Sequence, residues 1–195
     1  SVLGFAWSLI GPMLNYLVMG LVLSQVGRFS TPNYLAYMLL GSLVFNFMNV
    51  GFNLGGNSLI LNENYIRKIY LPKLVFPLSA IGMETVNFLL GFCALAVVLI
   101  PFGGLEFNRT GLFALVGFIL IMLFTLGIGL LCSVAFVFFR DLGHIVPVIM
   151  QIMFFTTPIV YPESAIPPEY VWTLQYNPFY HFVVCVRAPL INGQA

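Results

Sequence analysis

The chain has 195 residues, of which 61% are hydrophobic and only 7% are charged. A soluble domain carries about 25% charged residues, so a soluble fold of this size would leave wide apolar surfaces facing water. The mean hydropathy of +1.03 favours a membrane protein instead, because apolar side chains are stable in lipid. The net charge of +1 excludes a strongly basic, nucleic-acid-binding chain, and we expect no nucleic-acid partner.

The sequence offers no candidate metal, cofactor or catalytic site. Cys93, Cys132 and Cys185 are far apart and form no Cys-x-x-Cys pair, which favours roles as small packing residues. His144 and His181 each lack the neighbours of a nucleophilic triad. No glycine-rich run precedes a Lys and a Ser or Thr, so no phosphate loop for ATP hydrolysis is expected. We predict a protein that is not itself an enzyme.

Five apolar segments are long enough, or nearly so, to cross a bilayer as helices. In chain order they cover residues 3–26, 34–54, 74–100, 111–139 and 145–161. Spanning strands would be shorter and would alternate apolar with polar residues, so the pattern predicts an all-α, polytopic transmembrane bundle. The absence of an initiator methionine before Ser1 and the abrupt end at Ala195 indicate part of a longer protein, truncated at both ends.

Orientation follows from the basic residues near the span ends, because cytoplasmic loops are enriched in Lys and Arg. One set of loops holds Arg67, Lys68, Lys73 and Arg140, whereas the other holds Arg28, Arg109 and Arg187. This bias places the N-terminus, residues 55–73 and the tight turn at 140–142 in the cytoplasm. The tail after Tyr161 is then expected outside.

Residues 57–71 form an amphipathic segment between the second and third predicted spans. On a helical wheel, Leu59, Tyr65, Ile66, Ile69 and Tyr70 lie on one arc, and Glu63, Asn64, Arg67 and Lys68 lie on the opposite arc. Pro72 is expected to end this helix, since it lacks a backbone N–H. Two interpretations remain open on the wheel alone: an interfacial helix in the headgroups, or a coupling helix that docks on a cytoplasmic partner.

Glu84 lies inside the third predicted span, where a carboxylate is unfavourable and therefore a functional candidate. Asn87 lies one turn further along the same face and is expected to hydrogen-bond to it. A polar clamp between helices is the simpler interpretation, because one acid without a partner does not make a proton relay.

The fifth predicted span ends in the sequence FFTTPIVYP, where Pro158 should kink or stop the helix. The hydroxyls of Thr156 and Thr157 can bond the carbonyls that the proline leaves without a partner. The tail at 162–195 is rich in aromatic residues and prolines but too broken to span. We expect short helices at the outer membrane surface, with Tyr170, Trp172 and Tyr176 at headgroup depth.

Taken in order, several segments resemble the polysaccharide-export branch of the type 2 ABC exporter permeases, which export O-antigen and teichoic acid. These segments are SVLGFAWSLIGPMLNYLV, NSLILNENYIRKIYLPKLVFPLSA, FFRDLGHIVPVIMQIMFFTTPIVYP and the final NPF with the region around Arg187. The resemblance covers nearly the whole chain. It implies a permease of the bacterial cytoplasmic (inner) membrane with six spans, here five, that forms a homodimer with a second copy of itself. It also implies separate ABC ATPase subunits and a lipid-linked polysaccharide of the O-antigen, capsule or teichoic-acid type as substrate.

The resemblance also assigns roles to individual residues. It favours the coupling interpretation of 57–71, with Glu63, Tyr65, Ile66, Arg67, Lys68 and Ile69 against the ATPase. It implies that the first and fifth spans line a conduit in which Trp7, Tyr16, Phe154, Phe155 and Tyr161 stack on sugar rings. It assigns the external gate helices to 162–195 and the kink and gate to Pro158, Arg140 and Asp141.

Three other functions remain open from the sequence. A related ABC permease could export a drug or a simple lipid. A membrane-embedded transferase acting on lipid-linked sugars would need a pair of acids or histidines, which Glu84, Asp141 and His144 do not obviously supply. A secondary transporter would be expected to show paired intramembrane charges or an internal repeat, and neither is found.

Overall fold

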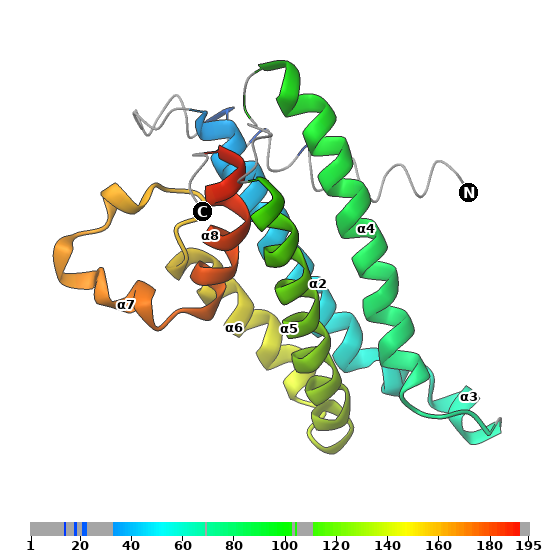
Figure 1. The fold of residues 1–195 in the computed structure, drawn as a ribbon. Coiled ribbons are helices and arrows are strands. Elements are labelled where there is room, and N and C mark those ends of the chain that lie inside the picture. The colour runs from blue at the N-terminus through cyan, green and yellow to red at the C-terminus, as the bar shows by residue number, and fades with distance from the viewer. Residues whose placement is uncertain are drawn as a thin grey trace.

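The computed structural model describes residues 33–68, 70–102, 104 and 111–191, together with the isolated positions 14, 18, 21 and 22. Trp7, Tyr16, Ile69 and nearly all of the first predicted span lie outside the described residues. The described helices are α2 (Tyr34–Leu61), α3 (Glu63–Lys68), α4 (Val75–Leu99), α5 (Gly111–Phe138), α6 (Leu142–Thr156), α7 (Trp172–Gln175) and α8 (Pro178–Ile191). The 3-10 turns η1 (Ile100–Phe102), η2 (Glu163–Ala165) and η3 (Pro168–Tyr170) join some of them (Figure 1). Across these ranges the chain is all-α, as predicted.

Three of the described helices, α2, α4 and α5, are long and apolar enough to cross a membrane. The shortest of them, α4, has 25 residues, which at about 1.5 Å per residue exceeds the roughly 30 Å of a bilayer core. The predicted spans at 74–100 and 111–139 agree with α4 and α5 to within one residue at each end. Hydropathy therefore located these two spans closely.

The helix α2 continues to Leu61, whereas the sequence predicted a span that stops at residue 54. Two glycines near residue 54, one inside the predicted span and one beyond it, are contact points with other helices. A Cβ on Gly56 would lie 2.5 Å from the Phe136 ring, and one on Gly51 would lie 2.4 Å from Thr125 Cγ2. Small residues let membrane helices approach closely, so these glycines permit the packing of α2 on α5 without ending the helix.

The helix α2 is the centre of the bundle and contacts α4, α5, α6 and α8. Its core contacts are largely aromatic. The ring of Phe47 stacks on Phe88 at 4.7 Å, and the rings of Phe45 and Phe52 lie 5.6 and 6.3 Å from Phe179 of α8. Such aromatic pairs add about 0.5–1.5 kcal/mol each beyond simple area burial, and here they join helices that are distant in the sequence.

The outward face of α5 consists of large apolar side chains. Those at least two-fifths exposed are Leu112, Phe113, Leu115, Val116, Ile119, Leu120, Leu123, Leu131, Val134, Val137 and Phe138. A surface of this kind is far larger than the apolar patches of soluble monomers. Lipid is the solvent that it fits.

The two connections predicted to be cytoplasmic lie at the same end of the bundle. The break between α2 and α3 and the turn between α5 and α6 both lie at what we call the α3 end, at the bottom of Figure 1. The opposite end, called the Tyr34 end, holds the first turn of α2 and the start of α5. The prediction that residues 55–73 and 140–142 share one side is consistent with this arrangement.

The helix α6 covers 15 residues, from Leu142 to Thr156, and not the predicted 145–161. Its length of about 22 Å is short of a bilayer core. The backbone of Thr157 is extended, with φ −95° and ψ 132°, as expected for a residue that precedes a proline. Pro158 therefore lies just beyond the end of α6 and acts as a stop for the helix.

The helix α8 differs from the surface helices predicted for the tail. It packs against α2 and α5, and Phe179, Val183, Val186, Arg187 and Leu190 are buried there. The preceding segment with η2, η3 and α7 extends to one side and returns to the bundle at Pro178 (Figure 1). Since α8 is only 14 residues long, its apolar composition gave no spanning signal, and its burial arises from helix packing.

The predicted polar pair in the third span is present in α4. Glu84 is buried, and the Nδ2 of Asn87 donates a hydrogen bond of 3.2 Å to Glu84 Oε2. This hydrogen bond joins two side chains of the same helix, so the predicted clamp between helices stays a prediction.

Candidate functional site

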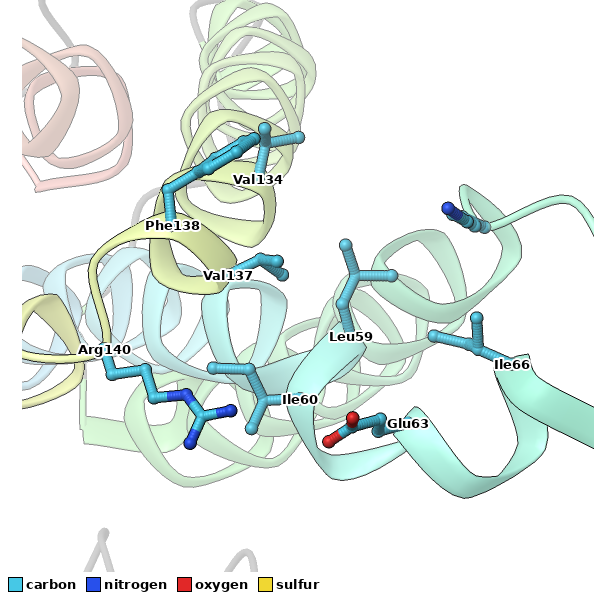
Figure 2. A pocket seen from close by; sticks show the side chains of 9 residues that line it. Leu59, Ile60, Glu63, Ile66, Val134, Val137, Phe138 and Arg140 are labelled. Carbon is cyan, nitrogen blue, oxygen red and sulfur yellow. The ribbon is translucent and has the colours of Figure 1, made fainter.

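A groove at the α3 end lies beneath the predicted coupling segment. It has a cavity volume of about 370 Å³ and is lined by Leu59, Ile60, Glu63, Ile66, Lys73, Val134, Val137, Phe138 and Arg140. We call it the α3 groove. Figure 2 shows the charged ends of Glu63 and Arg140 near Ile60, on the same side of the groove. Residues 59–73 therefore meet the distant residues 134–140 in this groove, and Lys73 and Arg140 are the basic residues that line it.

The predicted coupling helix at 57–71 is not one continuous helix. The helix α2 ends at Leu61, and the short α3 begins anew at Glu63. The break is stabilised by Asn62, whose Nδ2 donates a hydrogen bond of 2.8 Å to the Ser58 carbonyl. As a result, the helical wheel drawn through the whole segment was wrong at this point.

The buried and exposed side chains of α3 do not match the two arcs predicted from the helical wheel. Ile66 is half-buried and lines the α3 groove beside Glu63, whereas the neighbouring Tyr65 is 60% exposed. Glu63 also forms an ion pair with Arg67 along the exposed surface of the helix. Tyr65, Arg67 and Lys68 are thus accessible to a partner, while Ile66 faces the bundle itself.

A second groove runs between α2 and α6, with a cavity volume of about 550 Å³. It is lined by Phe45, Asn46, Asn49, Asn53, Pro147, Met150, Gln151, Phe154 and Phe155. We call it the amide groove, because four of these side chains are amides. Two of the predicted conduit residues, Phe154 and Phe155, form part of it, with ring centroids 5.5 Å apart.

An aromatic pocket lies beyond the amide groove, between the end of α6 and α7. It has a cavity volume of about 530 Å³ and is lined by Met153, Phe155, Thr156, Tyr161, Ile166, Tyr170, Trp172, Thr173, Leu174, Tyr176, Asn177 and Pro178. We call it the outer pocket. Phe155 lines both hollows, which therefore adjoin at this side chain. The predicted conduit residue Tyr161 lies here, together with the three aromatic residues predicted at headgroup depth.

The turn that follows α6 is fixed by side chains of α2 and α8. The carbonyl of Pro158 accepts hydrogen bonds from Arg187 Nη1 at 3.0 Å and from the Tyr37 hydroxyl at 3.1 Å. The Tyr34 hydroxyl donates to the Val160 carbonyl. Arg187 also lies 3.5 Å above the Tyr37 ring centroid and 3.5 Å from Glu163 Oε1. We call this set of contacts the outer clamp.

The start of α8 is joined to the end of α6 by hydrogen bonds. The Oδ1 of buried Asn177 accepts bonds from the backbone N–H groups of Phe179 and Tyr180, at 3.0 and 3.4 Å. Its Nδ2 donates to Thr157 Oγ1 at 2.9 Å, and Thr157 Oγ1 in turn donates to the Met153 carbonyl at 2.7 Å. Asn177 therefore satisfies helix-end groups that would be unfavourable in an apolar surrounding. The Met153 carbonyl also accepts the Thr157 backbone N–H, so it is not the carbonyl that Pro158 leaves without a partner, which is that of Phe154. The predicted role of the Thr157 hydroxyl is therefore wrong.

The three residues assigned to the kink and gate do not lie together. Pro158 belongs to the outer clamp, whereas Arg140 and Asp141 form the turn before α6, at the α3 end. The 15 residues of α6 separate them by about 22 Å. Arg140 instead lines the α3 groove, which places it with the coupling residues.

Sequence reasoning missed two sets of residues that the structure brings into these sites. Asn46, Asn49 and Asn53 recur at spacings of three and four, a helical pattern that was visible in the sequence. The role of Arg187 in the outer clamp had no such signal, because its partners lie on other helices.

The family model described as ABC-2 type transporter matches residues 1–191. The chain is 30% identical over 197 residues to the O-antigen export system permease protein RfbA of Klebsiella pneumoniae, covering 99% of this chain and 74% of that protein. It is 32% identical over 170 residues to the RfbA permease of Myxococcus xanthus, covering 87% of this chain and 65% of that protein.

A more distant similarity extends to the polysialic acid transport protein KpsM of Escherichia coli, at 23% identity over 198 residues. That match covers 98% of this chain and 75% of KpsM. Because the family model matches nearly the whole length, the chain belongs to the ABC-2 type transporter family.

Proposed function

We propose that the chain is the permease subunit of an ATP-driven exporter that moves a lipid-linked polysaccharide across the cytoplasmic membrane. The observation that carries this proposal is the succession of the amide groove and the outer pocket, joined at Phe155. Sugars present hydroxyl groups at their edges and apolar C–H groups on their faces, so they fit a wall of amides and aromatic rings. Relatives named as O-antigen export permeases support this substrate class.

The function is tested by deleting the gene in its host and measuring the surface polysaccharide. Export should stop in the deletion strain and return with the intact gene. The purified permease should bind a separate ATPase subunit and assemble as a homodimer, and the complex should hydrolyse ATP faster with the host's lipid-linked glycan. A complex stimulated by simple lipids or drugs but not by the glycan would contradict the proposal.

The coupling role of α3 gives a prediction about its two faces. Ile66→Asp places a carboxylate in the α3 groove and should shift α3 relative to the bundle. The half-buried Ile66 side chain contributes about half of the roughly 1.5–3 kcal/mol that full burial gives. Lys68→Ala removes an exposed charge, worth under about 1 kcal/mol. We therefore expect Ile66→Asp to uncouple export from ATP hydrolysis, so that ATP is hydrolysed with less export, far more than Lys68→Ala does.

Both activities are measured in vesicles that contain the permease and its ATPase. Tyr65→Ala serves as a further variant, because this exposed ring is available to the partner and should weaken ATPase binding without disturbing the groove. If both Ile66→Asp and Lys68→Ala retained wild-type export, the alternative of an interfacial helix would be favoured.

The orientation of the chain is tested by single cysteines at two exposed positions. Asn64→Cys lies in α3 and Ser164→Cys lies in η2, in a background whose native cysteines are replaced. A membrane-impermeant thiol reagent added to intact cells should label Ser164→Cys and spare Asn64→Cys. Opening the cells should make both reactive. The reverse pattern in intact cells would overturn the proposed cytoplasmic position of α3.

A further inference from the structure

We propose that Asn46, Asn49 and Asn53, together with Gln151, bind the hydroxyl groups of the glycan as it passes through the membrane. We call these four side chains the amide stripe. The inference rests on the proposed export function and names the side chains that hold the substrate. Three of them come from α2 and the fourth from α6, on the two sides of the amide groove.

The position of the amide stripe is informative because polar side chains are unfavourable in lipid. The three asparagines share one face of α2 and are each partly exposed, whereas neighbours such as Phe47 and Met48 are fully buried. Polar groups within spans face the bundle interior or a water-filled cavity. An amide face along a groove of about 550 Å³ therefore indicates polar contents in that groove.

The hydrogen bonds of the stripe leave capacity for a ligand. The Nδ2 of Asn53 donates to the Asn49 carbonyl at 2.8 Å and to Asn49 Oδ1 at 3.1 Å, which holds this pair in place. Within the described residues, no hydrogen bond is recorded for the side chains of Asn46 and Gln151, so each retains its donor and acceptor groups. A primary amide can donate to one sugar hydroxyl and accept from the next.

The rest of the groove has the complementary chemistry. Phe154 and Phe155 are joined there by Phe45, Pro147 and Met150. Phe155 is 60% exposed and lies at the junction with the outer pocket, so its ring is available for the apolar face of a sugar. A simple lipid tail cannot hydrogen-bond to the amides. A pyranose chain can hydrogen-bond to the amides and pack its apolar faces on the aromatic rings.

Another helix with polar side chains is the competing occupant of the groove, because amides also join helices in membranes. The lining favours a glycan. Close helix contacts in membranes use small residues, whereas this groove is lined by phenylalanines and a methionine. Its volume also falls within the range of small-molecule pockets, roughly 300–1,000 Å³.

Access to water gives the first test of the amide stripe. Gln151→Cys and its neighbour Ile152→Cys are compared in a background without the native cysteines, with the full permease and its ATPase in vesicles. Ile152 is exposed but does not line the groove. A charged methanethiosulfonate should modify Gln151→Cys at least about tenfold faster, because the reactive thiolate forms poorly in an apolar surrounding.

Export gives the second test. The double variant Asn46→Leu with Asn49→Leu keeps similar side-chain size but removes both amides, whereas Asn46→Gln with Asn49→Gln keeps them. Surface polysaccharide should form about tenfold more slowly in the leucine variant, the loss expected from two neutral hydrogen bonds. The glutamine variant should stay within about threefold of wild type, and both variants should still assemble with the ATPase.

The outcomes separate this inference from the proposed function. Wild-type polysaccharide export in the leucine variant would overturn the amide stripe and leave the export function standing. A wild-type complex that exports no polysaccharide would overturn the export function itself. Equal modification at positions 151 and 152, or a leucine variant that no longer assembles, would identify the stripe as a helix contact and also overturn the inference.

Discussion

Arg187→Met should loosen the turn after α6 and lower the stability of the folded protein by about 1.5–3 kcal/mol, the range for a hydrogen bond to a charged group. Arg187 is buried and donates to the Pro158 carbonyl at 3.0 Å, while its guanidinium lies over the Tyr37 ring. After substitution, the carbonyl keeps only the Tyr37 hydroxyl. The measurements are thermal unfolding in detergent and protease cleavage between residues 161 and 177.

Glu163→Gln is the matched control for this experiment. Glu163 lies 3.5 Å from Arg187, and its side chain is 46% exposed, so the ion pair is expected to contribute under about 1 kcal/mol. The backbone carbonyl, and not the carboxylate, should therefore be the main partner of Arg187. If Arg187→Met unfolded at the wild-type temperature and its turn remained protected, the outer clamp would have no stabilising role.

Arg187→Met also tests the prediction that the turn at Pro158 gates a conduit. The clamp fixes Pro158 and Val160 to α2 and α8, next to the outer pocket. In the reconstituted permease, Arg187→Met should therefore raise the resting ion leak more than Glu163→Gln does. Unchanged conductance in a loosened but folded variant would place the gate elsewhere.

Gly56→Ala should destabilise the contact between α2 and α5 by about 1–3 kcal/mol, the usual cost of overpacking a core. The added Cβ would lie 2.5–2.8 Å from three atoms of the Phe136 ring. Because the Phe136 side chain is fully buried, we expect the added methyl group to push the two helices apart. Thermal unfolding in detergent measures the effect.

Gly127→Ala, on α5, is the control for the helix contact. A Cβ at Gly127 meets nothing within 4 Å, and alanine favours a helix over glycine by up to about 1 kcal/mol. Stability should therefore stay the same or rise slightly. Adding Phe136→Leu to Gly56→Ala should restore part of the loss by shortening the opposing side chain. A Gly56→Ala protein as stable as wild type would show that α2 and α5 do not approach this closely.

The sequence by itself determined the class of the protein and much of its span pattern. Apolar runs of 25 residues or more can be stable only in lipid, and each requires a helix because its backbone groups must bond internally. The bounds of α4 and α5 followed directly, as did the tight turn at Arg140. These are local properties, in which each residue acts through its own hydropathy or backbone preference.

Only the tertiary structure decided how these helices form sites. The Tyr34 hydroxyl reaches the Val160 carbonyl across 126 positions, and Gln151 faces asparagines of α2 that no local pattern connects to it. The sequence placed Gly56 beyond the end of the second span, but it lies inside α2, where a Cβ would meet the Phe136 ring. Contacts of this kind depend on the faces that distant helices present to one another, whereas hydropathy records only that each helix is apolar.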